Sequence, residues 1–82
     1  MISAQRFSVS SEPVCLIRGD SRCSIRNRGD AAIYLGNDVV SADDGFQLDP
    51  GEAIGLKIRT DDWLYAVAAS GSQEVHVLSA SS

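Results

Sequence analysis

The sequence predicts an all-β fold, a small single-domain β-sandwich or barrel with seven or eight short strands, most simply of the jelly-roll type. Three observations support this prediction. Short segments alternate between apolar and polar residues, as strands with one buried face do. Turn residues recur about every ten positions. No window of eleven residues keeps the 3.6-residue period of an amphipathic helix.

The expected strands follow one another along the chain, each closed by a turn. They cover residues 6–10, 14–17, 22–27, 31–35, 46–48, 53–59, 64–69 and 74–78. The sixth is the clearest, because Ile54, Leu56 and Ile58 fall on one side while Lys57 and Arg59 fall on the other. One domain is expected to span residues 1–82, with flexible ends at 1–5 and 79–82.

Two turns are predicted from their residue types. Asp49-Pro50-Gly51-Glu52 fits a type II turn, in which Pro50 presets its own φ and Gly51 takes the positive φ of the third position. The segment Ser70-Gly71-Ser72 is expected to close a C-terminal hairpin between residues 64–69 and 74–78.

The tripeptide Arg-Gly-Asp occurs twice, at 18–20 and 28–30, ten residues apart. The spacing predicts a strand-plus-turn repeat, in which strands 14–17, 22–27 and 31–35 form a meander. Gly19 and Gly29 would then be needed for a backbone conformation that other residues avoid. The alternative is a displayed adhesion motif, because animal adhesion receptors read this tripeptide, but no secretion signal accompanies it.

The two cysteines, Cys15 and Cys23, would face each other across the first of these hairpins. A cross-strand disulfide and a pair of reduced, buried thiols both fit that placement. Synthesis in a reducing cytoplasm, expected because the first residues have no basic-then-apolar order, favours the reduced pair.

Composition argues against several function classes. The chain has 7 basic and 11 acidic residues, a net charge of −4 and a pI near 4.6, which is unfavourable for nucleic-acid binding. Its apolar runs are too short for a membrane span. His76 is the single histidine and alternates with valines on a strand, and no nucleophile motif, phosphate loop or zinc-ligand set accompanies it. We therefore expect no enzyme activity, no metal and no cofactor.

Two sets of side chains are candidates for an interface. Four cations fall on the side of their strands opposite the apolar residues and would share one face if these strands are neighbours: Arg26, Arg28, Lys57 and Arg59. Such a face could dock on an acidic protein surface. The aromatic residues Tyr34, Trp63 and Tyr65 either anchor contacts with a partner or fill the core.

From Ile25 onward the sequence resembles small β-structured virion proteins of tailed bacteriophages. The shared features are an Asn-x-Gly turn at 27–29, an Ile-Tyr-Leu-Gly strand at 33–36, Gly-Phe-x-Leu-x-Pro-Gly-Glu at 45–52, Leu-Tyr-Ala-Val at 64–67 and Val-x-Val-Leu at 75–78. The resemblance covers about two thirds of the chain, and the first 22 residues lie outside it.

This resemblance implies a structural role in the virion, most simply capsid decoration in many copies on the assembled shell. It also implies the major capsid protein or another virion protein as partner, and homo-oligomers, commonly trimers. The rival hypothesis from the residues themselves is a carbohydrate- or receptor-binding module of a tail or fibre. In that hypothesis Trp63 and Tyr65 stack on a sugar ring while Asp61 and Asp62 accept hydrogen bonds from its hydroxyl groups.

Overall fold

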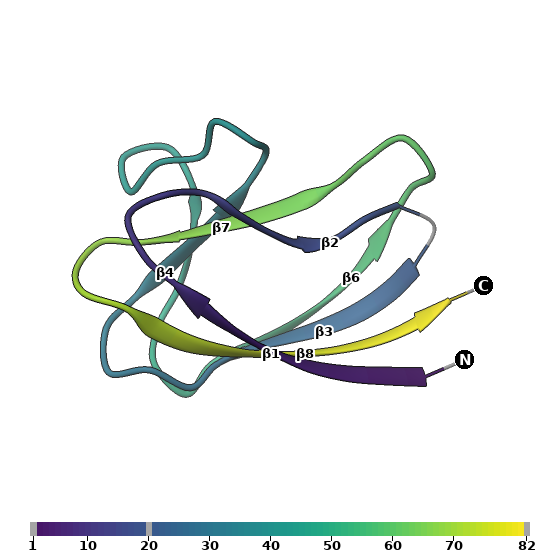
Figure 1. Cartoon of the computed structure of the whole chain (residues 1–82), viewed down its shortest axis with the longest axis horizontal. Helices are drawn as coiled ribbons and strands as arrows, with labels where there is room; N and C mark the ends of the chain where they lie inside the picture. The colour runs from purple at the N-terminus through teal and green to yellow at the C-terminus, as the bar shows by residue number, and fades with distance from the viewer. Residues whose placement is uncertain (1, 20, 82) are drawn as a thin grey trace.

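The computed structural model describes residues 2–19 and 21–81. Within them the chain forms two antiparallel four-stranded sheets that face each other (Figure 1), so the prediction of an all-β sandwich is confirmed. The strands are β1 (Ile2–Val9), β2 (Val14–Ile17), β3 (Ser21–Asn27), β4 (Ile33–Gly36), β5 (Phe46–Leu48), β6 (Ala53–Ile58), β7 (Leu64–Ala68) and β8 (Gln73–Ser81). No described residue belongs to a helix long and apolar enough to cross a membrane.

The strand pairing is nested. β4 pairs with β5, β3 with β6, β2 with β7 and β1 with β8, as though one long hairpin had been rolled up. Rolling divides the strands into sheet A, in the order β1-β8-β3-β6, and sheet B, in the order β2-β7-β4-β5. This order is that of a jelly roll, the fold type that the sequence predicted.

The nested pairing contradicts the predicted meander. β2, β3 and β4 alternate between the sheets, and β7 and β8 also lie in different sheets, so the turn at Ser70–Ser72 does not close a hairpin. β4 and β5 are the one pair of consecutive strands that share a sheet among the described residues. Turn residues mark where the chain reverses, but the next strand can pair with the last one or cross to the facing sheet.

The sequence predicted flexible ends at 1–5 and 79–82, and the described residues of both segments lie in strands. Ile2–Gln5 belong to β1 and pair with β8, where Ile2 lies opposite Ala80 and Ser3 opposite Ser79. β8 extends one residue beyond Ala80 to Ser81, which lies opposite Ser21 of β3. Both end segments of the described chain therefore lie within strands of sheet A.

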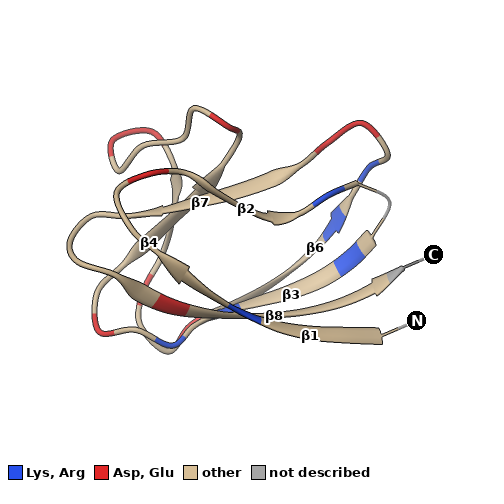
Figure 2. Cartoon of the chain, viewed as in Figure 1, with Lys and Arg blue, Asp and Glu red and all other residues tan. Residues whose placement is uncertain are grey.

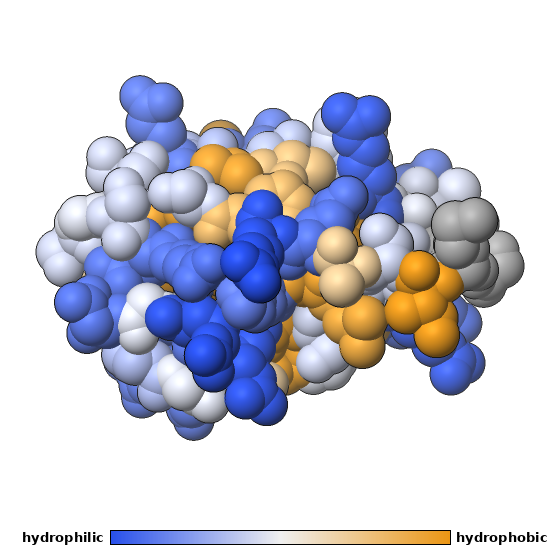
Figure 3. Space-filling model, turned by 60° about the horizontal axis from the view of Figure 1, so that its bottom comes forward, coloured by the Kyte–Doolittle hydropathy of each residue, from blue (hydrophilic) through white to orange (hydrophobic). Residues whose placement is uncertain are grey.

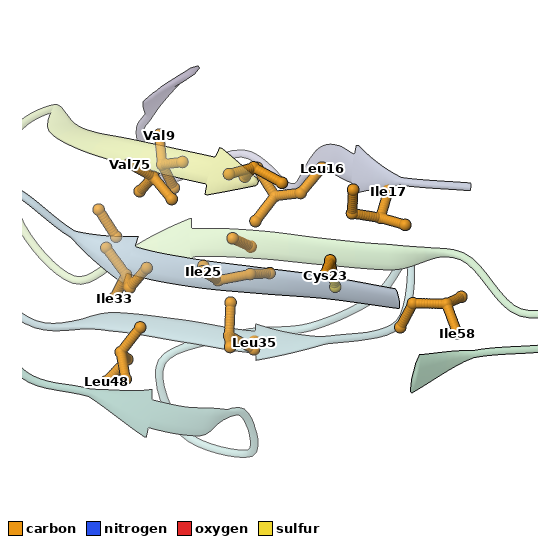
Figure 4. Close-up of a cluster of buried hydrophobic side chains, with 13 residues drawn as sticks. Val9, Leu16, Ile17, Cys23, Ile25, Ile33, Leu35, Leu48, Ile58 and Val75 are labelled. Atoms are coloured by element: carbon orange, nitrogen blue, oxygen red, sulfur yellow. The ribbon is translucent and has the colours of Figure 1, made fainter. Parts of the chain in front are cut away.

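The core lies between the sheets and is aliphatic (Figure 4). The buried cluster consists of Val9, Leu16, Ile17, Cys23, Ile25, Ile33, Leu35, Leu48, Ile58, Ala66, Ala68, Val75 and Val77. Phe7 packs against its edge, whereas Phe46 is 58% exposed although it continues the inward face of β5. Aliphatic side chains thus fill the space between the sheets, and no aromatic ring among the described residues is buried.

Asn27, at the end of β3, is fully buried and fixes the turn that follows it. Its side-chain Nδ2 donates hydrogen bonds to the carbonyl oxygens of Ala31 and Leu48, both at 2.9 Å. Its Oδ1 accepts a hydrogen bond from the Gly29 N–H, also at 2.9 Å. A single amide therefore joins the end of β3 to the turn before β4 and to β5.

Gln73, which is also buried, holds the other side of the same turn. Its Oε1 accepts hydrogen bonds from the N–H groups of Asp30 and Ala31, at 2.8 and 3.2 Å. The Arg28 N–H donates to the Glu74 carbonyl at 2.8 Å. Every backbone N–H of the second Arg-Gly-Asp copy is thus bonded within the fold, which supports its prediction as a turn.

Three positions were predicted to need glycine, and the structure gives a different reason for glycine at Gly51 than at Gly19 and Gly29. Gly51 has a φ of 83°, and the Glu52 N–H donates to the Asp49 carbonyl at 3.0 Å, so the predicted turn around Pro50 is confirmed. Gly19 and Gly29 do not have the positive φ of Gly51, and the space around them explains why they are glycines. A Cβ on Gly29 would overlap the Gln73 amide, and one on Gly19 would overlap the backbone of residues 59–60. Asp20, the last residue of the first copy, lies outside the described residues.

The cysteines do not face each other. Cys15 lies opposite Tyr65 in sheet B and Cys23 opposite Leu56 in sheet A, and both thiols are free. The predicted cross-strand contact is therefore wrong, because it depended on a hairpin that does not form. Burial raises the pKa of the Cys23 thiol, which is partly offset by a hydrogen bond with the Leu56 backbone.

Candidate functional site

The outward side of sheet A, called the outer face below, is an open sheet surface. The strand register places its side chains in rows that cross the strands in the order β1, β8, β3 and β6. The rows are Ile2, Ala80, Arg22 and Lys57; then Ala4, Leu78, Ser24 and Gly55; then Arg6, His76, Arg26 and Ala53; and finally Ser8 and Glu74, beside Arg28 just beyond β3.

Charge is segregated across the sandwich. The outer face holds five of the chain's seven basic residues, namely Arg6, Arg22, Arg26, Arg28 and Lys57. Glu74 is the one acidic residue in the described strands, and all other acidic residues in the described ranges lie in loops. Figure 2 shows most of these acidic loops on the side of sheet B. An acidic protein thus presents one basic face.

Three of these five basic residues, Arg6, Arg26 and Arg28, line a hollow of about 750 Å³. Arg6 and Arg26 flank His76 on the two neighbouring strands, and Arg28 lines the same hollow. The Nε2 atom of His76 lies 3.4 Å from Glu74 Oε1, but it is buried and makes no hydrogen bond. Figure 3, in which this side is turned toward the viewer, shows a dense group of hydrophilic residues.

An apolar strip continues the outer face beyond the hollow. Ile2 is 73% exposed and Leu78 is 50% exposed, and the small side chains of Ala4 and Ala80 lie beside them. Figure 3 shows hydrophobic residues next to the hydrophilic group. Exposed apolar side chains framed by arginines have the composition that protein interfaces favour.

The four cations predicted from sequence are only partly brought together. β3 and β6 are neighbours, as required, and Arg26 and Arg28 line the hollow. Because the strands are antiparallel, Lys57 lies opposite Arg22, two rows away from Arg26. Arg59 follows the end of β6 and lies outside the hollow.

Sequence reasoning missed Arg6, Arg22 and His76 as members of this surface. Alternation would have placed each of them on the outward side of its strand. What it could not provide was the neighbouring strand, since β8 lies between β1 and β3 although more than forty residues separate it from either.

The predicted aromatic residues lie in and around sheet B. Trp63 is 50% exposed, and the guanidinium carbon of Arg18 lies 5.1 Å from its ring centroid, a cation–π contact. Trp63 and Tyr65 line a second hollow of about 290 Å³, together with Asn37, Asp38, Asp61 and Asp62. The structure thus brings together all four residues of the carbohydrate-binding hypothesis.

Tyr34 belongs to a different environment. It is half-buried on the outward side of β4, beneath the loop that joins β4 to β5. Val40 of this loop is buried, and a Cβ on Gly45 would lie 2.6 Å from the Tyr34 Cβ and 2.8 Å from a Val40 methyl group. Tyr34 therefore packs beneath a loop, whereas Trp63 is open to partners.

The described acidic residues do not form a metal-binding group. No three or more His, Cys, Asp or Glu side chains in the described ranges are placed to hold an ion. Asp44 has a local role instead, because its Oδ1 accepts hydrogen bonds from the Ser41 N–H and hydroxyl at 2.9 and 3.0 Å. These bonds, with that from the backbone N–H the stronger, hold the pKa of Asp44 below its usual value.

Comparison of the chain with protein-family models gives no match, and comparison with curated protein sequences gives none either. The fold and surfaces define the class: a small jelly-roll sandwich with one basic, partly apolar sheet face and acidic loops.

Proposed function

We propose that this protein is a structural component of a bacteriophage virion, a capsid decoration protein that binds the assembled shell in many copies. The observation that carries the proposal is the outer face of sheet A, where basic residues and exposed apolar side chains are concentrated. The resemblance of residues 25–78 to small virion proteins supports it, and jelly rolls are common among viral capsid domains, which is an analogy of fold.

The segregation of charge indicates how the protein would be oriented on the shell. The outer face would lie on an acidic surface of the major capsid protein or another virion protein, with the acidic loops toward solvent. Arginine pairs with carboxylates at such interfaces, and Ile2 and Leu78 would bury apolar area there. Repetition of the shell, together with association into homo-oligomers such as trimers, would add avidity.

The test is the composition of purified particles. We expect this protein in fixed, many-fold stoichiometry with the major capsid protein, and we expect Arg26→Glu to be lost from the particles. Arg59→Glu is the matched control, because it reverses an exposed cation outside the hollow. A protein found in infected cells but never on particles would contradict the proposal.

A second candidate function is favoured by the hollow around Trp63. An exposed indole next to Tyr65 and to carboxylates can stack on a sugar ring and accept hydrogen bonds from its hydroxyl groups. The protein would then be a carbohydrate-binding module of a tail or fibre. Saturable binding of host-wall polysaccharide that Trp63→Ala abolishes would favour this function, and Tyr34→Phe, beneath its loop, is the control.

A further inference from the structure

The hollow of the outer face is lined by three arginines that have no acidic partner among the described residues. Arg6 and Arg26 are register partners of His76, so their Cα atoms flank its Cα at about 5 Å on either side. Arg28 is two residues beyond Arg26, about 7 Å along the chain direction. Three guanidinium groups can therefore converge above one imidazole.

These guanidinium groups are not neutralised within the described part of the chain. The one contact between a basic and an acidic side chain there joins His76 to Glu74, and none of Arg6, Arg26 and Arg28 takes part in one. Like charges on neighbouring strands destabilise a sheet. In a chain with more acids than bases, such a cluster is better explained by an anion from outside than by the stability of the fold.

The donors that remain open define the ligand. Each guanidinium group offers planar, paired N–H donors that match the two oxygens of an oxyanion, and it keeps its charge at all physiological pH values. His76 lines the same hollow, but its Nε2 atom is buried 3.4 Å from Glu74 Oε1, so the guanidinium groups supply the accessible donors. The Glu74 carboxylate near the rim disfavours a large polyanion.

The surroundings favour a carboxylate of a protein over a phosphate polymer. The apolar strip with Leu78 adjoins the hollow, and a net charge of −4 repels a nucleic acid as a whole. We infer that the hollow formed by Arg6, Arg26, Arg28 and His76 is a binding site for an Asp or Glu carboxylate on the partner protein's surface. This inference rests on the proposed function and specifies the contact by which the shell is recognised.

The first experiment uses the isolated protein. NMR titration with a short Asp- and Glu-rich peptide should shift the signals of Arg6, Arg26, Arg28 and His76, while those of Arg59 stay unchanged. Arg26→Gln should weaken peptide binding by about tenfold or more, as expected for the loss of a hydrogen bond between charged groups. Equal binding by the variant, or shifts scattered over the surface, would overturn the inference.

Two further ligands test whether the site prefers a protein carboxylate, free phosphate or the phosphates of a nucleic acid. Inorganic phosphate and a single-stranded DNA oligonucleotide are titrated in the same way, and both should bind more weakly than the peptide. Tighter binding of the oligonucleotide would overturn the assignment to a protein carboxylate. The melting temperature of Arg26→Gln should equal or exceed that of the parent, because the change relieves repulsion; a large decrease would show a structural role instead.

The second experiment separates this inference from the proposed function. Particles are reconstituted with parent protein, with Arg26→Gln and with Arg59→Gln. If the parent and Arg26→Gln occupy the shell equally, the carboxylate site is wrong while the decoration function stands. If the peptide binds in the hollow but the parent never joins particles, the site stands and the decoration function fails.

Discussion

Replacement of Asn27 tests the idea that one buried amide holds the second Arg-Gly-Asp turn in place. Asn27→Ala removes three hydrogen bonds of 2.9 Å, those with Gly29, Ala31 and Leu48. At about 1 kcal/mol each they contribute about 3 kcal/mol, and the stranded carbonyl of Leu48 adds about 1–3 kcal/mol. We therefore expect a loss of about 4–6 kcal/mol, a large part of the ~4–12 kcal/mol usual for a domain of this size.

A second variant tests the chemistry of the same site. Asn27→Asp keeps an acceptor for the Gly29 N–H but replaces the amide donor with an oxygen that faces two carbonyl oxygens. It also buries a charge, so at neutral pH it should destabilise the fold at least as much as the alanine variant does.

The assay is urea denaturation followed by Trp63 fluorescence and by circular dichroism. The control is Asn37→Ala, since Asn37 is exposed and its Oδ1 accepts a single bond from Val39 at 3.1 Å. The control should lose less than about 1 kcal/mol. A loss below about 1 kcal/mol in Asn27→Ala, or an aspartate variant as stable as the parent, would refute the reasoning.

Three further predictions concern single groups. Gly51→Val should cost about 1–3 kcal/mol in thermal or urea unfolding, because φ is positive there although the space around it is open. Ser41→Ala should raise the pKa of Asp44 in an NMR titration. Because that pKa is lowered in the folded parent, the ionised Asp44 carboxylate stabilises the fold, and this stabilisation is lost as the pH falls through the pKa of the folded state. The Cys23 thiol should be alkylated slowly in the folded protein and rapidly in urea; since its pKa is raised, its contribution to stability declines only at alkaline pH.

The sequence predicted the strands better than it predicted their partners. Alternation and turn residues are local, so the number and approximate positions of the strands, the turn at Gly51 and the outward sides of Arg26 and Lys57 were predicted correctly, although β1 and β8 are longer than expected. Pairing depends on contacts between segments far apart, such as β1 with β8, and no local signal distinguishes a hairpin turn from one that crosses between sheets.

The same limit explains the errors at the cysteines and glycines. A hairpin turn would bring Cys15 and Cys23 together, whereas the observed turn crosses between the sheets and separates them. Gly29 was predicted for its backbone angle, yet its neighbour Gln73 lies 44 positions away and leaves no room for a Cβ. Local sequence patterns do not predict which distant segments approach each other closely.

The pairing of β1 with β8 has a consequence for how this domain can be joined to other polypeptide. Ile2 and Ala80 are direct neighbours across the two strands, so any peptide attached before or after the described chain leaves from the same corner (Figure 1). That geometry suits insertion into a surface loop of a second protein, and it suits display of a fused cargo. Joining the ends by a short linker and opening the chain between β4 and β5 would give a circular permutant with the same sheets.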